Sequence, residues 1–205
     1  MVSSARRCQE GPAPAARPRL VARAQAALAG VLGPGAVAVD ATAGNGHDTL
    51  FLARAVGPAG RVYALDVQQA AVTATRARLA EAGLAERVHL VRAGHETLPA
   101  PVPAADRGRV AVVMFNLGYL PGGDHGLITR PQTTWAALEA AGALLAPGGR
   151  LSVLAYTGHR GGGEEAEAVR TWVAGLPAAR FASDRSGGAT DAAPRLWVIE
   201  RRVAG

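Results

Sequence analysis

Short runs rich in Val, Ile and Leu alternate along most of this chain with longer segments rich in Ala, Leu and Arg. The short runs predict strands over 37–40, 62–66, 88–92, 110–116, 151–156, 180–183 and 196–201. The longer segments predict helices over 20–32, 47–56, 69–82, 133–145 and 164–176, most of them ended by Gly or Pro. Repeated strand–helix alternation indicates a mostly parallel sheet with helices on both faces, so we expect a doubly wound α/β fold.

The length of 205 residues is that of one domain with a tail. Residues 1–18 are rich in Pro, Ala and Arg without periodicity, so we expect a flexible tail there and one domain over 19–205. No apolar run reaches the roughly 18 residues that a membrane span needs. Prolines also interrupt the place where a signal peptide would be apolar. We therefore expect a cytoplasmic protein that does not bind membranes.

The net charge is +6, and all 22 basic side chains other than His are arginine. Arginine suits phosphate, so the charge is compatible with a nucleic-acid partner. On charge alone an ordinary solvated basic surface is the favoured explanation, and attraction to nucleic acid stays open. The single cysteine, Cys8, lies in the predicted tail, so neither an internal disulfide nor a thiolate metal site is expected.

The segment 40–48 reads Asp-Ala-Thr-Ala-Gly-Asn-Gly-His-Asp and joins a predicted strand to a predicted helix. Glycines in such a turn let the backbone approach a ligand closely. Asp66 ends the next strand, at the spacing that places an acid on a ribose hydroxyl. We predict that a nucleoside cofactor is bound by Asp40, Thr42, Gly44, Asn45, Gly46, Asp48, Asp66 and Gln68.

The identity of the nucleoside follows from two departures from the dinucleotide-binding pattern. That pattern has a third glycine where this chain has Thr49, and it has no use for an acid at position 40. A sulfonium nucleoside carries positive charge and has no pyrophosphate, so an acid suits it. The loop therefore favours S-adenosylmethionine over a nicotinamide dinucleotide, with a purely structural turn as the alternative.

The segment Ala93-Gly94-His95-Glu96 follows the third predicted strand. Open α/β sheets bind ligands at the carboxyl ends of their strands, so this loop is expected beside the cofactor. His95 or Glu96 could reach the adenine, and we include His95 among the cofactor-binding residues. The alternative is that Glu96 only begins a short helix and His95 is an ordinary loop residue.

The fourth predicted strand leads into Asn-Leu-Gly-Tyr-Leu-Pro-Gly-Gly-Asp-His at 116–125. The Asn116 carbonyl can accept a hydrogen bond from a substrate nitrogen, and this residue also borders the expected cofactor site. The Tyr119 ring offers a stacking face for a base. Asp124 or His125 could act as general base. The spacing is similar to the Asn-Pro-Pro-Tyr loop of amino-group methyltransferases, with Leu-Gly in place of the two prolines.

Two later segments hold candidate substrate-binding residues. Residues 129–134 begin a predicted helix and leave Arg130 free to meet a phosphate, although an ordinary capped helix start explains them as well. Residues 156–165 combine His159 with three glycines, which indicates either a mobile loop or a close ligand approach. The acidic residues at 164, 165 and 167 suit the positive end of a helix dipole.

Four of these segments together resemble the YtqB/MnmM-like rRNA methylase family: 40–48, 116–125, 129–134 and 158–162. The resemblance covers about 20–205, with Tyr-Thr-Gly-His at 156–159 where Tyr-Pro-Gly-His is expected. It implies a Rossmann-like class I methyltransferase fold, with seven strands of which the last is antiparallel, and S-adenosylmethionine as cofactor. It also implies methylation of the 5-aminomethyl group of a modified wobble uridine in tRNA, which gives the methylaminomethyl form.

The sequence is therefore compatible with three functions. The first is a tRNA N-methyltransferase, with tRNA as partner and a homodimer as a compatible assembly. The second is a class I methyltransferase acting on rRNA, a protein or a small-molecule amine. The third is a non-catalytic nucleoside-binding module.

Overall fold

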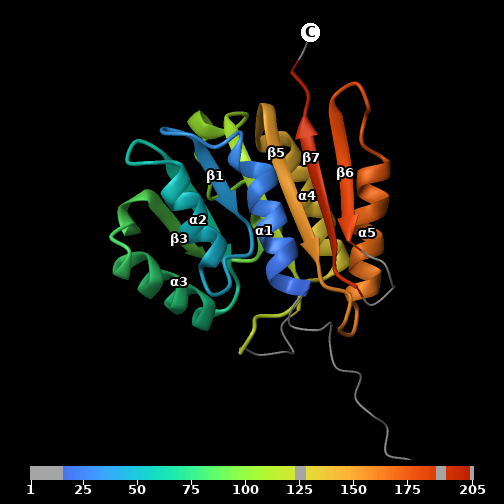
Figure 1. Cartoon of the computed structure of the whole chain (residues 1–205), viewed down its shortest axis with the longest axis horizontal. Helices are drawn as coiled ribbons and strands as arrows, with labels where there is room; N and C mark the ends of the chain where they lie inside the picture. The colour runs from blue at the N-terminus through green and yellow to red at the C-terminus, as the bar shows by residue number, and fades with distance from the viewer. Residues whose placement is uncertain (1–15, 123–127, 188–192, 204–205) are drawn as a thin grey trace, which may run out of the picture.

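The computed structural model describes residues 16–122, 128–187 and 193–203, whose arrangement is shown in Figure 1. Seven strands form one sheet in the order β3-β2-β1-β4-β5-β7-β6. They are β1 (Val37–Asp40), β2 (Arg61–Asp66), β3 (Val88–Arg92), β4 (Val110–Leu117), β5 (Leu145–Ala155), β6 (Phe181–Gly187) and β7 (Arg195–Arg201). Strand β7 pairs antiparallel with both β5 and β6, whereas the pairs among β1 to β5 are parallel. The predicted doubly wound sheet with an antiparallel last strand is confirmed.

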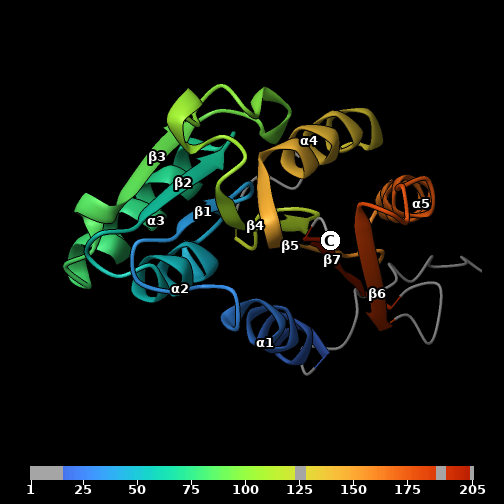
Figure 2. The ribbon, with the colours of Figure 1, turned by 90° about the horizontal axis from the view of Figure 1, so that it is seen from above.

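Helices cover both faces of the sheet, as the view from above shows (Figure 2). One face carries α1 (Ala16–Ala29), α2 (His47–Ala55) and α3 (Gln69–Glu81), and the other carries α4 (Pro131–Leu144) and α5 (Gly162–Ala174). Short 3-10 helices span Ala85–Arg87, His95–Thr97 and Ala104–Asp106. Helix α1 begins at Ala16, so helical structure extends into the segment predicted as a tail.

The apolar core consists of two clusters, one on each face of the sheet. Leu28, Leu52 and Leu79 belong to the cluster under α1 to α3. Phe115 and Trp197 belong to the cluster under α4 and α5. Because both faces are covered, the central strands are apolar on both sides, which explains the continuous Val-rich runs in the sequence.

The junction between α4 and β5 differs from the prediction. The helix ends at Leu144 and the strand begins directly at Leu145, whereas the sequence predicted a Pro-Gly-Gly loop and a strand from 151. The β4–β5 register shifts between Val110 and Val112, so the Pro-Gly-Gly segment is an irregularity within β5. A Cβ at Gly149 would lie 2.8 Å from the Val110 carbonyl oxygen, so this close approach requires glycine.

The parallel strands point their carboxyl ends to one edge of the sheet. The loops after β1, β2, β3 and β4 therefore meet there, although they are far apart in the sequence. Over the described ranges, no helix is both long enough and apolar enough to cross a membrane.

Candidate active site

A pocket of about 2050 Å³ opens at this edge of the sheet, between the strand-end loops and the facing sides of α1 and α2. Of the predicted site residues, those that line it are Thr42, Gly44, Asn45, Asp48, Asp66, Gln68, His95, Asn116, Tyr119 and Arg130. Asp40, Gly46 and His159 do not line it. Asp124 and His125 lie outside the described residues.

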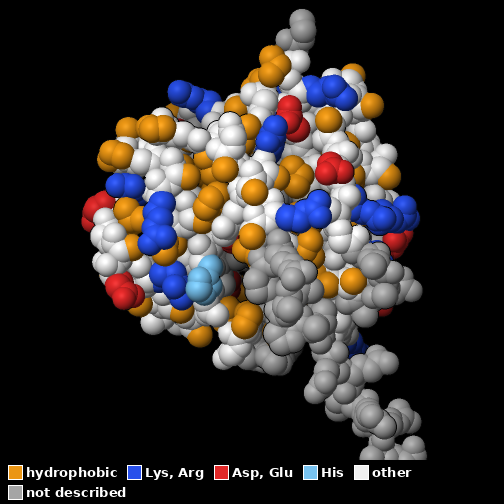
Figure 3. Space-filling view, in the orientation of Figure 1, with side chains coloured by type: hydrophobic (Ala, Val, Ile, Leu, Met, Phe, Trp, Pro, Cys, Tyr) orange, Lys and Arg blue, Asp and Glu red, His pale blue; other side chains and the backbone are white. Residues whose placement is uncertain are grey.

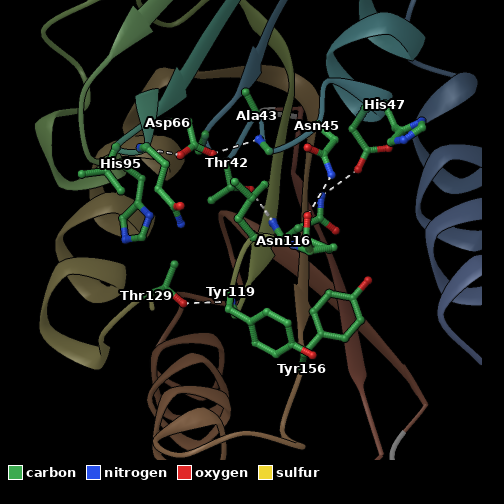
Figure 4. Close-up of a pocket in the computed structure, with 18 of the residues that line it drawn as sticks. Thr42, Ala43, Asn45, His47, Asp66, His95, Asn116, Tyr119, Thr129 and Tyr156 are labelled. Atoms are coloured by element: carbon green, nitrogen blue, oxygen red, sulfur yellow. Dashed lines mark hydrogen bonds between the residues drawn. The ribbon is translucent and has the colours of Figure 1, made fainter. Parts of the chain in front are cut away.

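The end of β2 and the loop after β1 are joined through Asp66. Its Oδ2 accepts a hydrogen bond from the Gly44 N–H at 2.9 Å, and its Oδ1 accepts one from the Gln68 N–H at 2.9 Å. A carboxylate oxygen has two lone pairs, so each oxygen keeps one for a ligand. Asp66 is half-buried and lies beside the loop in Figure 4. Its position suits the predicted contact with a ribose hydroxyl.

Gly46 allows the loop after β1 to pack closely against a neighbouring helix. Its φ is +80°, and a Cβ there would lie 2.9 Å from the Thr75 Cα on α3. The Thr75 hydroxyl donates to the Gly44 carbonyl at 3.0 Å, and the Arg78 Nε donates to the Asn45 carbonyl at 2.8 Å. Gly46 thus allows the loop to pack on α3, while its neighbours face the pocket.

Asp40 lies beneath the loop. It is fully buried, its Oδ2 accepts from the Thr49 hydroxyl at 2.6 Å, and its Oδ1 accepts from the Thr42 N–H at 3.2 Å. Burial, with a smaller contribution from the charge of Asp48, raises the pKa of Asp40 to about 7, although both hydrogen bonds act against the rise. Asp40 thus lies under the loop and does not line the pocket, and its predicted contact with the cofactor stays a prediction.

Asp48, near the start of α2, orients an amide at the centre of the pocket. Its Oδ2 accepts from the Asn116 Nδ2 at 2.7 Å, and its Oδ1 accepts from the Gln25 Nε2 at 2.7 Å. An ionised carboxylate only accepts hydrogen bonds, so both amides turn their NH2 groups toward it. The Asn116 carbonyl oxygen is therefore left for another donor.

Gln25 on α1 was not among the predicted site residues. It lies between Val21 and Leu28 at helical spacing, on a face that is otherwise apolar. A polar side chain in such a stripe was the available signal. The sequence does not say what it would meet, because its partner Asp48 lies 23 residues away.

The loop after β4 places two tyrosines at one side of the pocket. The Asn116 N–H donates to the Thr42 hydroxyl at 2.7 Å, which joins this loop to the loop after β1. In Figure 4 the rings of Tyr119 and Tyr156 both lie below Asn116. Tyr156 follows β5 and lines the pocket, although it was not among the predicted site residues. The two rings offer the aromatic surface that a base would stack on.

His159 packs against the ring of Tyr119. The two rings meet edge to face with centroids 5.8 Å apart, and the His159 Nδ1 lies 3.0 Å from the Arg160 carbonyl oxygen. His159 does not line the pocket, but its ring partner Tyr119 does. Its predicted contact with substrate stays a prediction.

His95 is 6% exposed and packs edge to face against Phe115, with centroids 6.0 Å apart. Burial lowers the pKa of His95, against the opposing charge of Glu96, so the ring is neutral at pH 7. Glu96 lies in the first turn of the short 3-10 helix and also borders the pocket. Both readings of this loop made from the sequence are thus compatible with its structure.

The charged side chains that line the pocket differ in exposure. Asp48 is buried and Asp66 is half-buried, whereas Arg54, Glu96 and Arg130 are exposed. In Figure 3 arginine side chains are spread over the face that carries α1 and α2. The buried acid suits a cationic ligand within the pocket. The mouth carries both signs, and its two arginines are the groups that suit a polyanion outside.

Arg130 is the N-cap residue of α4, and its side chain makes no capping hydrogen bond. Its carbonyl accepts from the Thr133 hydroxyl at 3.0 Å and from the Thr134 N–H at 2.9 Å. Because these bonds use only its backbone, the exposed guanidinium can still meet a phosphate.

Within the described ranges, no group of three or more His, Cys, Asp or Glu side chains could hold a metal ion.

Glu165 was assigned only to the dipole of its helix, yet it is 1% exposed in the first turn of α5. It accepts hydrogen bonds from the hydroxyl groups of Thr129 and Thr134, the second at 2.6 Å. Burial raises the pKa of Glu165, while both hydroxyl groups and His159 oppose the rise. No local pattern distinguishes it from the solvated Glu164, since only tertiary packing buries one of the two.

Known proteins with this architecture share its sequence pattern. A family model described as "Putative rRNA methylase" matches residues 62–199. The chain is 43% identical over 155 residues to the Arabidopsis thaliana protein named "tRNA (mnm(5)s(2)U34)-methyltransferase, chloroplastic", with 72% of this chain and 56% of the relative covered. The chain thus spans about half the length of that curated relative.

Two solved structures are similar over most of the chain. An rRNA-methylase structure from Clostridium thermocellum superposes with a TM-score of 0.83 at 38% identity, covering 89% of this chain and 97% of that one. A methyltransferase structure from Streptococcus mutans, solved in complex with SAH, has a TM-score of 0.78 at 33% identity and covers 89% and 98%.

Proposed function

This chain belongs to the rRNA methylase family, and on that basis we propose that it is an S-adenosylmethionine-dependent tRNA N-methyltransferase. The proposed reaction adds a methyl group to the 5-aminomethyl group of a modified wobble uridine and gives the methylaminomethyl form. The name of the Arabidopsis relative supports this substrate, and the S. mutans complex supports the cofactor.

The pocket fits the proposed cofactor in charge and shape. The lone pairs left on Asp66 suit the ribose hydroxyls, and the buried carboxylate of Asp48 suits a positive charge inside the pocket. The neutral ring of His95 suits a base at the end of β3. When bound, the cofactor supplies an electrophilic methyl group on a sulfonium centre.

The orientation of Asn116 is the observation that carries the proposal. With its NH2 group held by Asp48, its carbonyl oxygen is available to accept from a substrate N–H. Such an acceptor suits an amine, which keeps N–H bonds while its lone pair attacks, better than it suits a carbon nucleophile. The rings of Tyr119 and Tyr156 would hold the uridine base beside it, as aromatic side chains hold flipped bases.

Positioning supplies most of the proposed rate enhancement, because the transfer needs no covalent intermediate with the protein. The amine attacks only when neutral, so one proton must leave before the transfer. Asp124 and His125 remain the predicted acceptors of this proton. Asp48 is already committed to two amide donors.

The exposed cations at the mouth support RNA as the proposed partner. Arg54 and Arg130 lie at an entrance that a tRNA anticodon loop would have to approach with its phosphates. Cytoplasmic location and a homodimer stay predictions, and the name of the Arabidopsis relative places that protein in the chloroplast.

Methyl transfer to tRNA from a strain lacking this gene tests the proposal. Purified protein and labelled S-adenosylmethionine would be incubated with this tRNA, followed by nucleoside mass spectrometry. We expect conversion of 5-aminomethyl-2-thiouridine to its N-methyl form. We expect no transfer to matched tRNA from a strain that cannot build the aminomethyl group. Incorporation into rRNA or a free amine alone would refute the tRNA assignment and favour the second function class.

A further inference from the structure

A buried carboxylate behind the pocket connects two of its walls. The two oxygens of Glu165 accept hydrogen bonds from different hydroxyl groups, those of Thr129 and Thr134. Each hydroxyl has one hydrogen, which it donates to Glu165, so its oxygen can only accept from other groups. The carboxylate thus makes each of these two hydroxyl oxygens an acceptor in any further hydrogen bond.

The first threonine holds the loop that carries Tyr119. The Gly118 N–H donates to the Thr129 hydroxyl oxygen at 3.0 Å, and the Thr129 N–H donates to the Gly118 carbonyl at 3.2 Å. The adjoining pair, Tyr119 and Ile128, forms an isolated antiparallel bridge. Glu165 therefore fixes the backbone directly before the tyrosine that is proposed to hold the base.

The second threonine reaches the cofactor side of the pocket. The Thr134 hydroxyl oxygen lies 3.5 Å from the His95 Nε2, a long contact for a hydrogen bond. Since the hydroxyl hydrogen goes to Glu165, this contact can be a hydrogen bond only when His95 is the donor. The neutral ring then carries its proton on Nε2 and keeps Nδ1 as its acceptor.

We propose that Glu165 is a positioning residue that aligns the substrate side of the pocket, through Thr129, with the cofactor side, through Thr134. Its kinetic consequence rests on the proposed methyltransferase function. The carboxylate touches neither ligand. It acts by fixing the tyrosine loop and the tautomer of His95 in one hydrogen-bonded chain that runs from Gly118 to His95.

Conservative substitutions of Glu165 and Thr129 test this role. In Glu165→Gln, one acceptor becomes a donor, so one threonine must reverse its hydroxyl. We expect kcat for tRNA methylation to fall roughly 10- to 100-fold, as for a small misalignment of reacting groups, with little change in Tm. Thr129→Val should lose activity similarly, whereas Thr129→Ser keeps the hydroxyl and should retain it.

Glu139→Gln is the matched control. Glu139 also joins α4 to α5, through a 2.6 Å hydrogen bond from the Trp172 Nε1. Its partner Trp172 does not line the pocket, whereas Thr129, a partner of Glu165, does. Its kcat should stay near that of the wild type. A fall in kcat shared by Glu139→Gln and Glu165→Gln, or an unchanged kcat in Glu165→Gln, would overturn the positioning role.

The His95 tautomer gives a readout that does not need activity. Nitrogen-15 spectra of histidine-labelled protein should show the His95 proton on Nε2 in the wild type and a changed tautomer balance in Glu165→Gln. A proton on Nδ1 in the wild type would overturn the proposed chain. If the wild-type protein methylates no tRNA, the proposed function fails, and the spectra still decide the inference.

Discussion

The substitution Asp48→Asn tests how the pocket orients its central amide. An asparagine at this position has one acceptor and one donor group, so it can accept from only one of Gln25 and Asn116. If Asn116 reverses, its NH2 group faces the substrate nitrogen and the required acceptor is lost. The hydrogen bond between Asn116 and the carboxylate measures 2.7 Å, and a bond to a charged group contributes about 1.5–3 kcal/mol.

This range corresponds to a fall of about 10- to 150-fold in kcat, measured with tRNA at saturating S-adenosylmethionine. Asp106→Asn is the control. Asp106 is 6% exposed and accepts from the Tyr63 hydroxyl at 2.6 Å, but it does not line the pocket. It should lose stability and keep its kcat. An unchanged kcat in Asp48→Asn, or an equal fall in both variants, would refute the orienting role of Asp48.

Three further substitutions probe the rest of the site. Asn116→Ala should lower kcat roughly 100-fold while calorimetry finds nearly unchanged cofactor affinity, and an equal loss of both would contradict its role toward the amine. The pKa of Asp40 is raised from 3.8 to about 7, so the folded state holds a proton that the unfolded state releases between these values. Between pH 4 and 7 the free energy of unfolding of the wild type should therefore fall by on the order of 4 kcal/mol relative to that of Asp40→Asn. Parallel plots of Tm against pH for the two proteins would refute the raised pKa of Asp40. Gly46→Ala would place a Cβ on a residue with a φ of +80°, 2.9 Å from the Thr75 Cα. Urea unfolding should therefore show a free energy of unfolding lower by about 2–4 kcal/mol. A decrease below about 0.5 kcal/mol would mean that α3 shifts to accommodate the methyl group.

Local patterns in the sequence were sufficient for the fold and for the place of the site. Strand and helix periodicities depend on near neighbours, and the glycines and prolines between them mark where each element stops. Since parallel strands must end at one edge, the polar loops after 40, 66, 92 and 116 had to meet there. Their residues account for much of the pocket lining.

The direction of each side chain was decided only by tertiary structure. Along β1, Ala38 packs in the cluster under α1 to α3 and Val39 in the opposite one, so Asp40 returns to the first face and meets Thr49 of α2. Sequence reasoning treated the end of this strand as open to the pocket, whereas Asp40 is buried and does not line it. Gln25 and Glu165 act through partners that are 23 to 36 residues away in the sequence. Those contacts exist because helices far apart in the sequence pack side by side on one face of the sheet, α1 beside α2 and α4 beside α5, a relation that no local window of sequence contains.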